Sequence, residues 1–233
     1  LGRFVGSDRV LTVSNGTLAI LCALMLVDLE PGDRVIVPTY TFASVVNPIM
    51  LLGATPILVD SDPTTVNIDL DAVEEVLRRD DGVRALVHVD VGGLPPDYDR
   101  LNALSERYGV AVVEDAAEAL GSEYRGRRVG ASPHIATLSF QRAKQLSSGE
   151  GGALVLPSAE LYERAALLRN HGMSRTYEHT AFGLNFRLPA LAAAVGVAQI
   201  DRLDSFIAHR GEVMAAYRAG LGQALTFQDV PAG

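Results

Sequence analysis

The chain has 233 residues, of which 48% are hydrophobic, and its 28 acidic against 20 basic residues give a net charge of −8. This length and composition allow one large domain with a sizeable core, and the acidic balance argues against nucleic acid or an anionic membrane as the main partner. The single cysteine, Cys22, excludes an internal disulfide, and the longest apolar run, 18–27, is too short to span a bilayer.

The first motif is a Ser-Asn-Gly-Thr turn at 14–17, followed by a predicted helix over 18–29. A Gly-Thr turn that opens a helix offers unpaired backbone N–H groups, a hydroxyl and the positive end of the helix dipole, which together suit a phosphate. The same four residues also make a good helix cap. The motif by itself therefore predicts either a phosphate site or only a cap.

Short apolar strands then alternate with helices. The predicted strands are 33–37, 56–60, 84–89 and 110–114, and the predicted helices are 43–52, 69–79 and 97–108. This order indicates a mostly parallel sheet covered by helices, whose ligands lie beyond the carboxyl ends of the strands. Three residues follow such ends: Phe42, which a core position would also explain, Asp90, which turn formation would also explain, and Asp115, which a helix cap would also explain.

Two further apolar runs, 135–140 and 152–156, flank a polar loop that contains Lys144 and a Gly-Glu-Gly-Gly cluster. A lysine amine forms a Schiff base with a carbonyl, and pyridoxal phosphate is the commonest cofactor that offers one. A lone lysine in a glycine-rich loop is more often a solvated surface residue, so the surrounding motifs decide between the two interpretations.

The last part of the chain predicts a helix over 159–169, the sequence Asn-His-Gly at 170–172 and the motif Gly-Leu-Asn-Phe-Arg-Leu at 183–188. A long amphipathic helix, bent at some point, is expected over 191–221 with Arg202, Arg210 and Arg218 toward solvent. The five histidines show no metal-ligand spacing, so no metal site is predicted.

Several of these motifs occur in the order found in one family. The Ser-Phe-x-x-x-Lys-x-x-Ser-Ser-Gly-Glu-Gly-Gly segment, the Glu-Asp-Ala-Ala-Glu-Ala-Leu-Gly-Ser segment at 114–122 and the 183–188 motif resemble those of the DegT/DnrJ/EryC1/StrS family of pyridoxal-phosphate enzymes, mostly sugar aminotransferases. The resemblance runs from about Val10 to Tyr217. It implies an α/β fold, the large domain of a fold-type-I pyridoxal-phosphate transferase similar to aspartate aminotransferase.

The expected domain division follows from the same resemblance. Residues 1–200 would form the cofactor-binding domain without its first helices, and residues 201–233 would form a long helix and the start of a small C-terminal domain that is largely missing.

The resemblance also assigns roles to residues. Lys144 and Asp115 would be catalytic, because the lysine carries the cofactor and the carboxylate pairs with its ring nitrogen and keeps that nitrogen protonated. Phe42 would lie flat against the ring, and Asn185 would reach the phosphate of the neighbouring subunit, unless it is only a turn residue. The full cofactor-binding set is Gly16, Thr17, the amide of Leu18, Phe42, Asp115, Glu118, Ser139, Lys144 and Asn185.

Two residues depart from the family pattern. Glu118 stands where relatives usually have a glutamine whose amide donates toward the phenolic oxygen of the cofactor, and a carboxylate cannot donate unless it is protonated. Gln141 stands where most relatives have histidine. A glutamine at this position resembles the pattern of the branch that aminates ketocyclitols and that of aminohydroxybenzoate synthases.

The resemblance implies a cytoplasmic aminotransferase that moves an amino group from glutamate or glutamine to a keto-sugar nucleotide or ketocyclitol, in secondary-metabolite or polysaccharide biosynthesis. The enzyme would be a homodimer with shared active sites, without nucleic acid, membrane or metal as partner. Retention of Lys144 argues against the dehydratase branch of the family, in which histidine replaces it. Two alternatives stay open: a lysine-bearing enzyme on this scaffold that makes an aminobenzoate, and a non-catalytic pyridoxal-phosphate-binding regulator.

Overall fold

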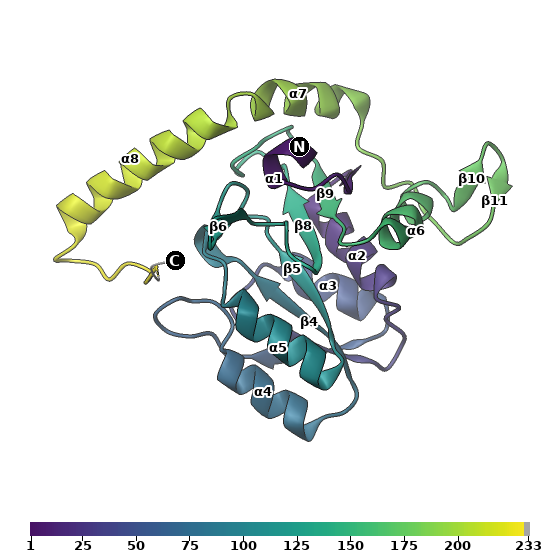
Figure 1. Ribbon diagram of the computed structural model, residues 1–233, viewed down its shortest axis with the longest axis horizontal. Coiled ribbons are helices and arrows are strands. Elements are labelled where there is room, and N and C mark those ends of the chain that lie inside the picture. The colour runs from purple at the N-terminus through teal and green to yellow at the C-terminus, as the bar shows by residue number, and fades with distance from the viewer. Residues whose placement is uncertain (231–233) are drawn as a thin grey trace.

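The computed structural model describes residues 1–230 and contains one central sheet of seven strands in the order β1-β9-β8-β5-β4-β2-β3 (Figure 1). The strands from β8 to β3 are mutually parallel, and β9 pairs in antiparallel fashion with both β1 and β8. The predicted mostly parallel sheet is therefore confirmed. Its strands are β1 (Val10–Val13), β2 (Arg34–Pro38), β3 (Thr55–Val59), β4 (Val83–Val89), β5 (Ala111–Asp115), β8 (Ile135–Ser139) and β9 (Gly152–Val155).

Helices cover both faces of this sheet. The helices are α1 (Gly2–Val5), α2 (Gly16–Leu26), α3 (Ala43–Leu51), α4 (Leu70–Arg79), α5 (Tyr98–Tyr108), α6 (Ala159–Arg169), α7 (Ala190–Ile200) and α8 (Leu203–Leu221), with a short 3₁₀ turn η1 (Val91–Gly93). Two small hairpins complete the description: β6 (Glu123–Tyr124) with β7 (Arg127–Arg128), and β10 (Met173–Arg175) with β11 (Glu178–His179). None of the helices described is long and apolar enough to cross a bilayer.

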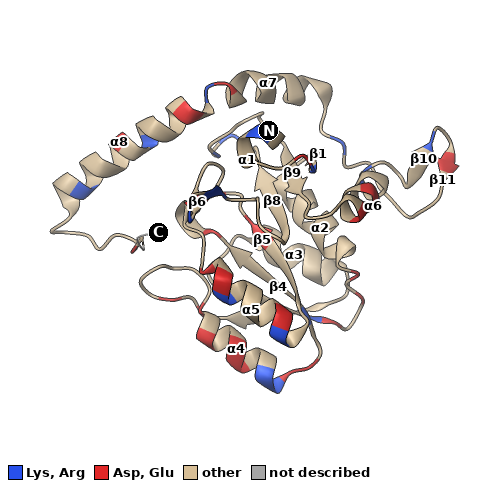
Figure 2. Ribbon diagram, viewed as in Figure 1, with Lys and Arg blue, Asp and Glu red and all other residues tan. Residues whose placement is uncertain are grey.

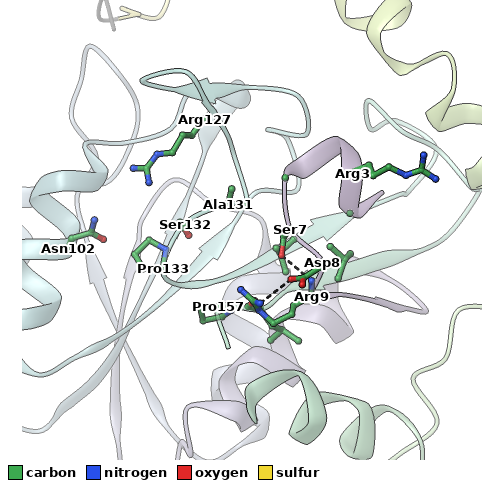
Figure 3. A pocket seen from close by; sticks show the side chains of 16 residues that line it. Arg3, Ser7, Asp8, Arg9, Asn102, Arg127, Ala131, Ser132, Pro133 and Pro157 are labelled. Atoms are coloured by element: carbon green, nitrogen blue, oxygen red, sulfur yellow. Dashed lines mark hydrogen bonds and ion pairs between the residues drawn. The ribbon is translucent and has the colours of Figure 1, made fainter. Parts of the chain in front are cut away.

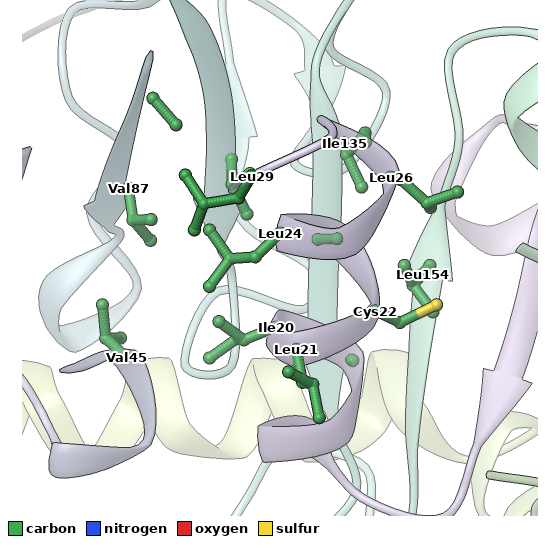
Figure 4. Packing of buried hydrophobic residues seen from close by; sticks show 14 of the residues in the cluster. Ile20, Leu21, Cys22, Leu24, Leu26, Leu29, Val45, Val87, Ile135 and Leu154 are labelled. Carbon is green, nitrogen blue, oxygen red and sulfur yellow. The ribbon is translucent and has the colours of Figure 1, made fainter. Parts of the chain in front are cut away.

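The core on the α2 face explains why that helix is apolar nearly all round. Ile20 and Leu24 are at most 2% exposed and pack toward Val45 and Val87 (Figure 4), and each such buried side chain contributes about 1.5–3 kcal/mol to folding. Cys22 belongs to the same core, as expected, and burial raises the pKa of its thiol to about 12. Helix α2 is thus a rigid element whose N-terminus is fixed relative to the strands.

Helices α4 and α5 cover the other face through a separate apolar cluster that includes Val73, Leu101 and Leu86. Their charged residues lie on the outside (Figure 2). The N-terminus of each helix is marked in the sequence by an aspartate that caps it, Asp69 in α4 and Asp97 in α5. Such caps satisfy backbone N–H groups that the helix itself leaves unpaired, which is why the sequence located these starts to within one residue.

The predicted helix over 191–221 is instead two helices, α7 and α8, separated at Asp201 and Arg202 (Figure 1). Both extend along one side of the sheet domain, and Leu203 is the buried residue they contribute. Arg202, Arg210 and Arg218 are exposed, as predicted. Apolar side chains of these helices are exposed too, among them Leu191 at 85%, so the amphipathic pattern does not correspond to packing within this chain.

Candidate active site

A cavity of about 900 Å³ lies at the carboxyl ends of β2, β4, β5 and β8, where ligands of such sheets bind. The N-terminus of α2 closes one side of it. Seven of the nine expected cofactor-binding residues line this cavity: Gly16, Thr17, Phe42, Asp115, Glu118, Ser139 and Lys144. Segments far apart in the sequence therefore meet at one place, and the two exceptions are Leu18 and Asn185.

Helix α2 begins two residues earlier than predicted, at Gly16, because Asn15 caps it. The Leu18 amide, which we expected to contact a phosphate, donates to Asn15 Oδ1 at 2.9 Å. The amides of Gly16 and Thr17 have no acceptor within the described part of the chain. Capping therefore uses the Leu18 amide, whereas the amides of Gly16 and Thr17 remain available to an anion, so the phosphate interpretation stays a prediction.

Gly16 allows this terminus to approach strand β8 closely. A Cβ atom added at Gly16 would lie 2.9 Å from the Cβ of Ser139, and one added at Gly152 would lie 2.6 Å from the backbone of Asn15. These two glycines therefore bring the free amides of α2 next to the Ser139 hydroxyl. The result is a concave group of donors of the kind that holds a phosphate.

Lys144 is the only lysine in the chain. Its side chain is 23% exposed, and its Nζ donates to Oε1 of Glu118 at 3.3 Å. The loop that carries it is fixed locally, because the Lys144 amide donates to the Gln141 carbonyl at 2.9 Å and the Gln141 side chain accepts from the Ala143 amide at 2.8 Å. The lysine is a cavity residue and not a freely solvated one.

Asp115 is the last residue of β5 and is 4% exposed. Its Oδ1 accepts from the Ala117 amide at 3.1 Å, so it does act as a local cap, and it also lines the cavity. Burial raises the pKa of Asp115 to about 6, while the Ala117 amide and the charge of Lys144 oppose the rise. At neutral pH the carboxylate is still ionised and can pair with a cationic group in the cavity.

Phe42 is 78% exposed and lines the cavity together with Tyr40 and Thr41. The alternative of a core position is therefore wrong for this residue. Its ring lies at the mouth of the cavity, where an apolar face remains available to a planar ligand. Tyr40 and Thr41 belong to the same loop after β2, and their position after a strand end could have identified them from the sequence.

Asn185 lies outside the cavity and is exposed. Asn185 forms an isolated antiparallel bridge with Asn170, and the neighbouring Phe186 is buried at 6% exposure. The projecting element is the β10–β11 hairpin just before it (Figure 1).

The α4–α5 face of the sheet contains a buried polar group of four side chains that no sequence motif indicated, namely His88, Asp90, Tyr98 and Glu114. His88, Asp90 and Glu114 are each 0% exposed, and the Tyr98 hydroxyl donates to Glu114 Oε1 at 3.0 Å and lies 3.2 Å from Asp90 Oδ2. Burial raises the pKa of Asp90 well above its ordinary value and that of Glu114 to about 7. Asp90 therefore forms its turn through the backbone, while its side chain does not border the cavity.

A second cavity, of about 870 Å³, lies near α1 and the loop before β8 (Figure 3). Its charged residues do not converge: Arg9 pairs with Asp8 at 3.0 Å, and Arg3 and Arg127 point away from each other. None of the predicted site residues lines it.

Fold and cavity together define a class of protein, an α/β domain with a mostly parallel sheet and a cavity at its strand ends lined by a lysine, a buried aspartate and the amides of a helix terminus. A model of the DegT/DnrJ/EryC1/StrS aminotransferase family matches residues 1–232, and the chain belongs to this family. Aminotransferases of this family depend on pyridoxal phosphate in general.

Individual relatives agree with this membership. The chain is 37% identical to a GDP-perosamine synthase of Escherichia coli O157:H7 over 90% of its own length and 58% of the relative's. The structure of Streptomyces venezuelae DesV in complex with a ketimine intermediate matches with a TM-score of 0.95 and 35% identity, over 99% of this chain and 62% of that one. A 3-amino-5-hydroxybenzoic acid synthase matches with a TM-score of 0.90 and 38% identity, over 95% and 58%. The chain thus spans about three fifths of the length of these relatives.

Proposed function

We propose that the protein is a pyridoxal-phosphate-dependent aminotransferase that moves an amino group from glutamate or glutamine to a keto-sugar nucleotide or a ketocyclitol. The observation that carries this proposal is the meeting of Lys144, Asp115 and the free amides of Gly16 and Thr17 in one cavity. Relatives named for amination of GDP-, UDP- and dTDP-sugars support the substrate class.

The residues present fit this cofactor. Gly16, Thr17 and Ser139 would hold its phosphate, Phe42 would cover its ring, and Asp115 would face its ring nitrogen. When bound, pyridoxal phosphate supplies an aldehyde that a primary amine captures and a ring that accepts electron density from carbon. The buried carboxylate of Asp115 would hold a proton on the ring nitrogen, because an anion beside that nitrogen favours its cationic form.

Lys144 would hold the cofactor through its amine and release it when an amino donor takes its place. Its freed amine would then remove the proton from the α-carbon of the donor and deliver it to the C4′ carbon of the cofactor. Ile20, Val89 and Val91 contribute apolar side chains to the cavity wall. The keto substrate would react through the same proton transfers in reverse order.

The proposal is tested with protein expressed from its full reading frame. Incubation with pyridoxal phosphate and then with glutamate or glutamine should convert the cofactor spectrum, and a dTDP-, UDP- or GDP-keto-sugar should restore it with formation of an amino sugar. Absence of spectral conversion with every donor would favour the non-catalytic regulator instead.

A second candidate is formation of an aminobenzoate. The similarity to 3-amino-5-hydroxybenzoic acid synthase favours it, as does the position of Gln141 in the cavity lining. Mass spectrometry of the products separates the two, because only this reaction yields an aromatic acid from a cyclic keto acid.

We infer in addition that two copies of the chain share their active sites, with Asn185 of each directed at the phosphate of the other. Asn185 is exposed and lies outside the cavity of its own chain. Two large apolar residues next to it, Phe182 and Leu184, are 67% and 42% exposed, and Phe42 at the cavity mouth is 78% exposed. Exposed apolar groups of this extent are typical of an interface.

A further inference from the structure

The turn η1 forms one rim of the cavity, and a buried asparagine holds both of its ends. Asn67 is 3% exposed; its Oδ1 accepts from the Val91 amide at 3.1 Å, and its Nδ2 donates to the Leu94 carbonyl at 2.9 Å. Both polar atoms of a buried side chain are thus used on one turn. The turn is therefore fixed to the loop between β3 and α4.

A second side chain holds the same turn from the segment that follows α8. The Nε2 of Gln228 donates to the carbonyls of Val91 at 2.9 Å and Thr65 at 2.6 Å. Gly92 has a φ of 63°, and a Cβ added there would lie 3.0 Å from Oε1 of Gln228. Glycine at this position therefore allows both the turn and the approach of Gln228.

The inner side of η1 contacts Glu118, and Glu118 also contacts Lys144. The Gly92 amide donates to Oε2 of Glu118 at 3.1 Å, and Lys144 Nζ donates to Oε1 at 3.3 Å. Two donors on opposite sides need two acceptor oxygens, which a carboxylate has and a glutamine amide lacks. This is a structural reason for glutamate at a position where the family usually has glutamine.

We propose that Glu118 positions Lys144 by joining it to the turn η1, and that Asn67 and Gln228 are positioning residues that hold this turn in place. The role rests on the proposed function of Lys144 as the residue that carries the cofactor. Glu118 is 48% exposed, so the ion pair contributes little to folding. Its effect is on the lysine side chain, whose many rotamers it restricts to those directed along the cavity wall.

The reactivity of Lys144 toward acetic anhydride, measured by mass spectrometry on the cofactor-free protein, tests this coupling directly. An amine paired with a carboxylate is held back from attacking an electrophile, so Glu118→Gln should increase acylation of Lys144 by about two- to fivefold. Gln228→Met keeps the size of the side chain, removes both donations to the turn, and should increase acylation in the same direction. Gln223→Met, an exposed position on the same segment, is the matched control and should have no effect.

The double variant decides whether the residues act through one chain of contacts. If they do, Glu118→Gln with Gln228→Met should react like Glu118→Gln alone, whereas independent effects would multiply and would overturn the proposal. Unchanged acylation in Glu118→Gln would overturn it as well, even if Gln228→Met failed to fold. Labelling by pyridoxal phosphate and borohydride is measured in parallel, and its failure would reject the cofactor role of Lys144 without altering the acylation result.

Discussion

At the scale of single residues, Lys144 and Asp115 carry the proposed chemistry, and their surroundings differ in kind. Lys144 lies on a loop with a charged partner and partial access to solvent, whereas Asp115 is almost fully buried at a strand end. An amine on a partly exposed side chain and a buried carboxylate suit their proposed roles, because the lysine must exchange partners while the aspartate must keep one. Each role has a direct test.

Lys144 should be the residue that binds pyridoxal phosphate. The protein with cofactor should be yellow, and borohydride should fix the cofactor covalently on the peptide that contains Lys144. Within residues 1–233 the label can be assigned without ambiguity, because Lys144 is the only lysine there. Lys144→Ala is the control and should remain uncoloured after dialysis. Label on a different peptide, or no label at all, would contradict the assignment.

Asp115→Asn should slow the first half-reaction by at least about a hundredfold, since each 1.4 kcal/mol of lost stabilisation costs about tenfold in rate. The cofactor should still bind, because the phosphate contacts are unchanged. Stopped-flow absorbance with glutamate measures the rate.

Asp97→Asn is the matched control, because Asp97 also accepts from a backbone amide, at 3.1 Å, but lies outside the cavity. A rate near that of the unaltered protein for Asp115→Asn would show that Asp115 is only a cap.

At the scale of elements, the site depends on how closely helix α2 meets strands β8 and β9. The apolar core fixes the helix along its length, and Gly16 and Gly152 allow its N-terminus to approach the strands closely. The sheet contributes the second requirement, a row of strand ends at one edge. Neither element offers a phosphate site without the other, because the free amides and the Ser139 hydroxyl come from different segments.

Gly16→Ala should weaken the binding of pyridoxal phosphate by about tenfold, which corresponds to about 1.4 kcal/mol. The added methyl group would lie 2.9 Å from the Cβ of Ser139 and would push the free amides away from the hydroxyl. Titration followed by absorbance measures the affinity. Gly220→Ala, at a helical position with open space around it, serves as control. Equal affinities of the two variants would argue against close packing at the phosphate end.

The buried group between β5 and α5 predicts a dependence of stability on pH. The pKa of Glu114 rises from 4.5 to about 7, chiefly because of burial, so the folded state binds a proton that the unfolded state releases. The free energy of unfolding should therefore fall as the pH increases through this range, by on the order of 1–3 kcal/mol from this group.

In Glu114→Gln the slope of this decline should be shallower, whatever the overall stability of the variant. Urea unfolding at a series of pH values measures it. Glu106→Gln, at an exposed position on α5, is the control and should keep the original slope. If the unfolding free energy of Glu114→Gln fell with pH as steeply as that of the control, Glu114 would be ionised in the folded state over the whole pH range measured.

At the scale of the whole molecule, α7, α8 and the segment around Asn185 expose large apolar residues, which the proposed association with a second copy would cover. Leu191, Val197 and Phe182 are each more than 60% exposed. Their burial by a second copy would bring stabilisation in proportion to the area removed from water. The shared active site that we infer depends on this association.

Mixing two inactive variants tests the shared site. In a hybrid of Lys144→Ala and Asn185→Asp chains both defects would fall in the same site, which would lack the amine and would carry a carboxylate against the phosphate. The other site would combine Lys144 from one chain with Asn185 from its partner, so activity should return to a fraction of that of the unaltered protein. Each variant mixed with itself is the control. Failure to recover activity despite proven subunit exchange would defeat the shared site.

The sequence by itself determined the alternation of strands and helices, because apolar runs and capping aspartates such as Asp69 and Asp97 act locally. Through the family resemblance of its motifs it also indicated residues that enter the cavity, although each residue alone left an alternative open. Phe42, Asp115 and Lys144 are of this kind, and all three line the cavity.

Only the tertiary structure decided which polar groups form hydrogen bonds with each other. It showed that Glu118 accepts from both Gly92 and Lys144, each 26 residues away along the chain. It also directed Asp90 into a buried polar group on the α4–α5 face of the sheet. A sequence lists donors and acceptors, but hydrogen bonds form between atoms within about 3.2 Å of each other, and only folding brings segments so distant along the chain to that separation.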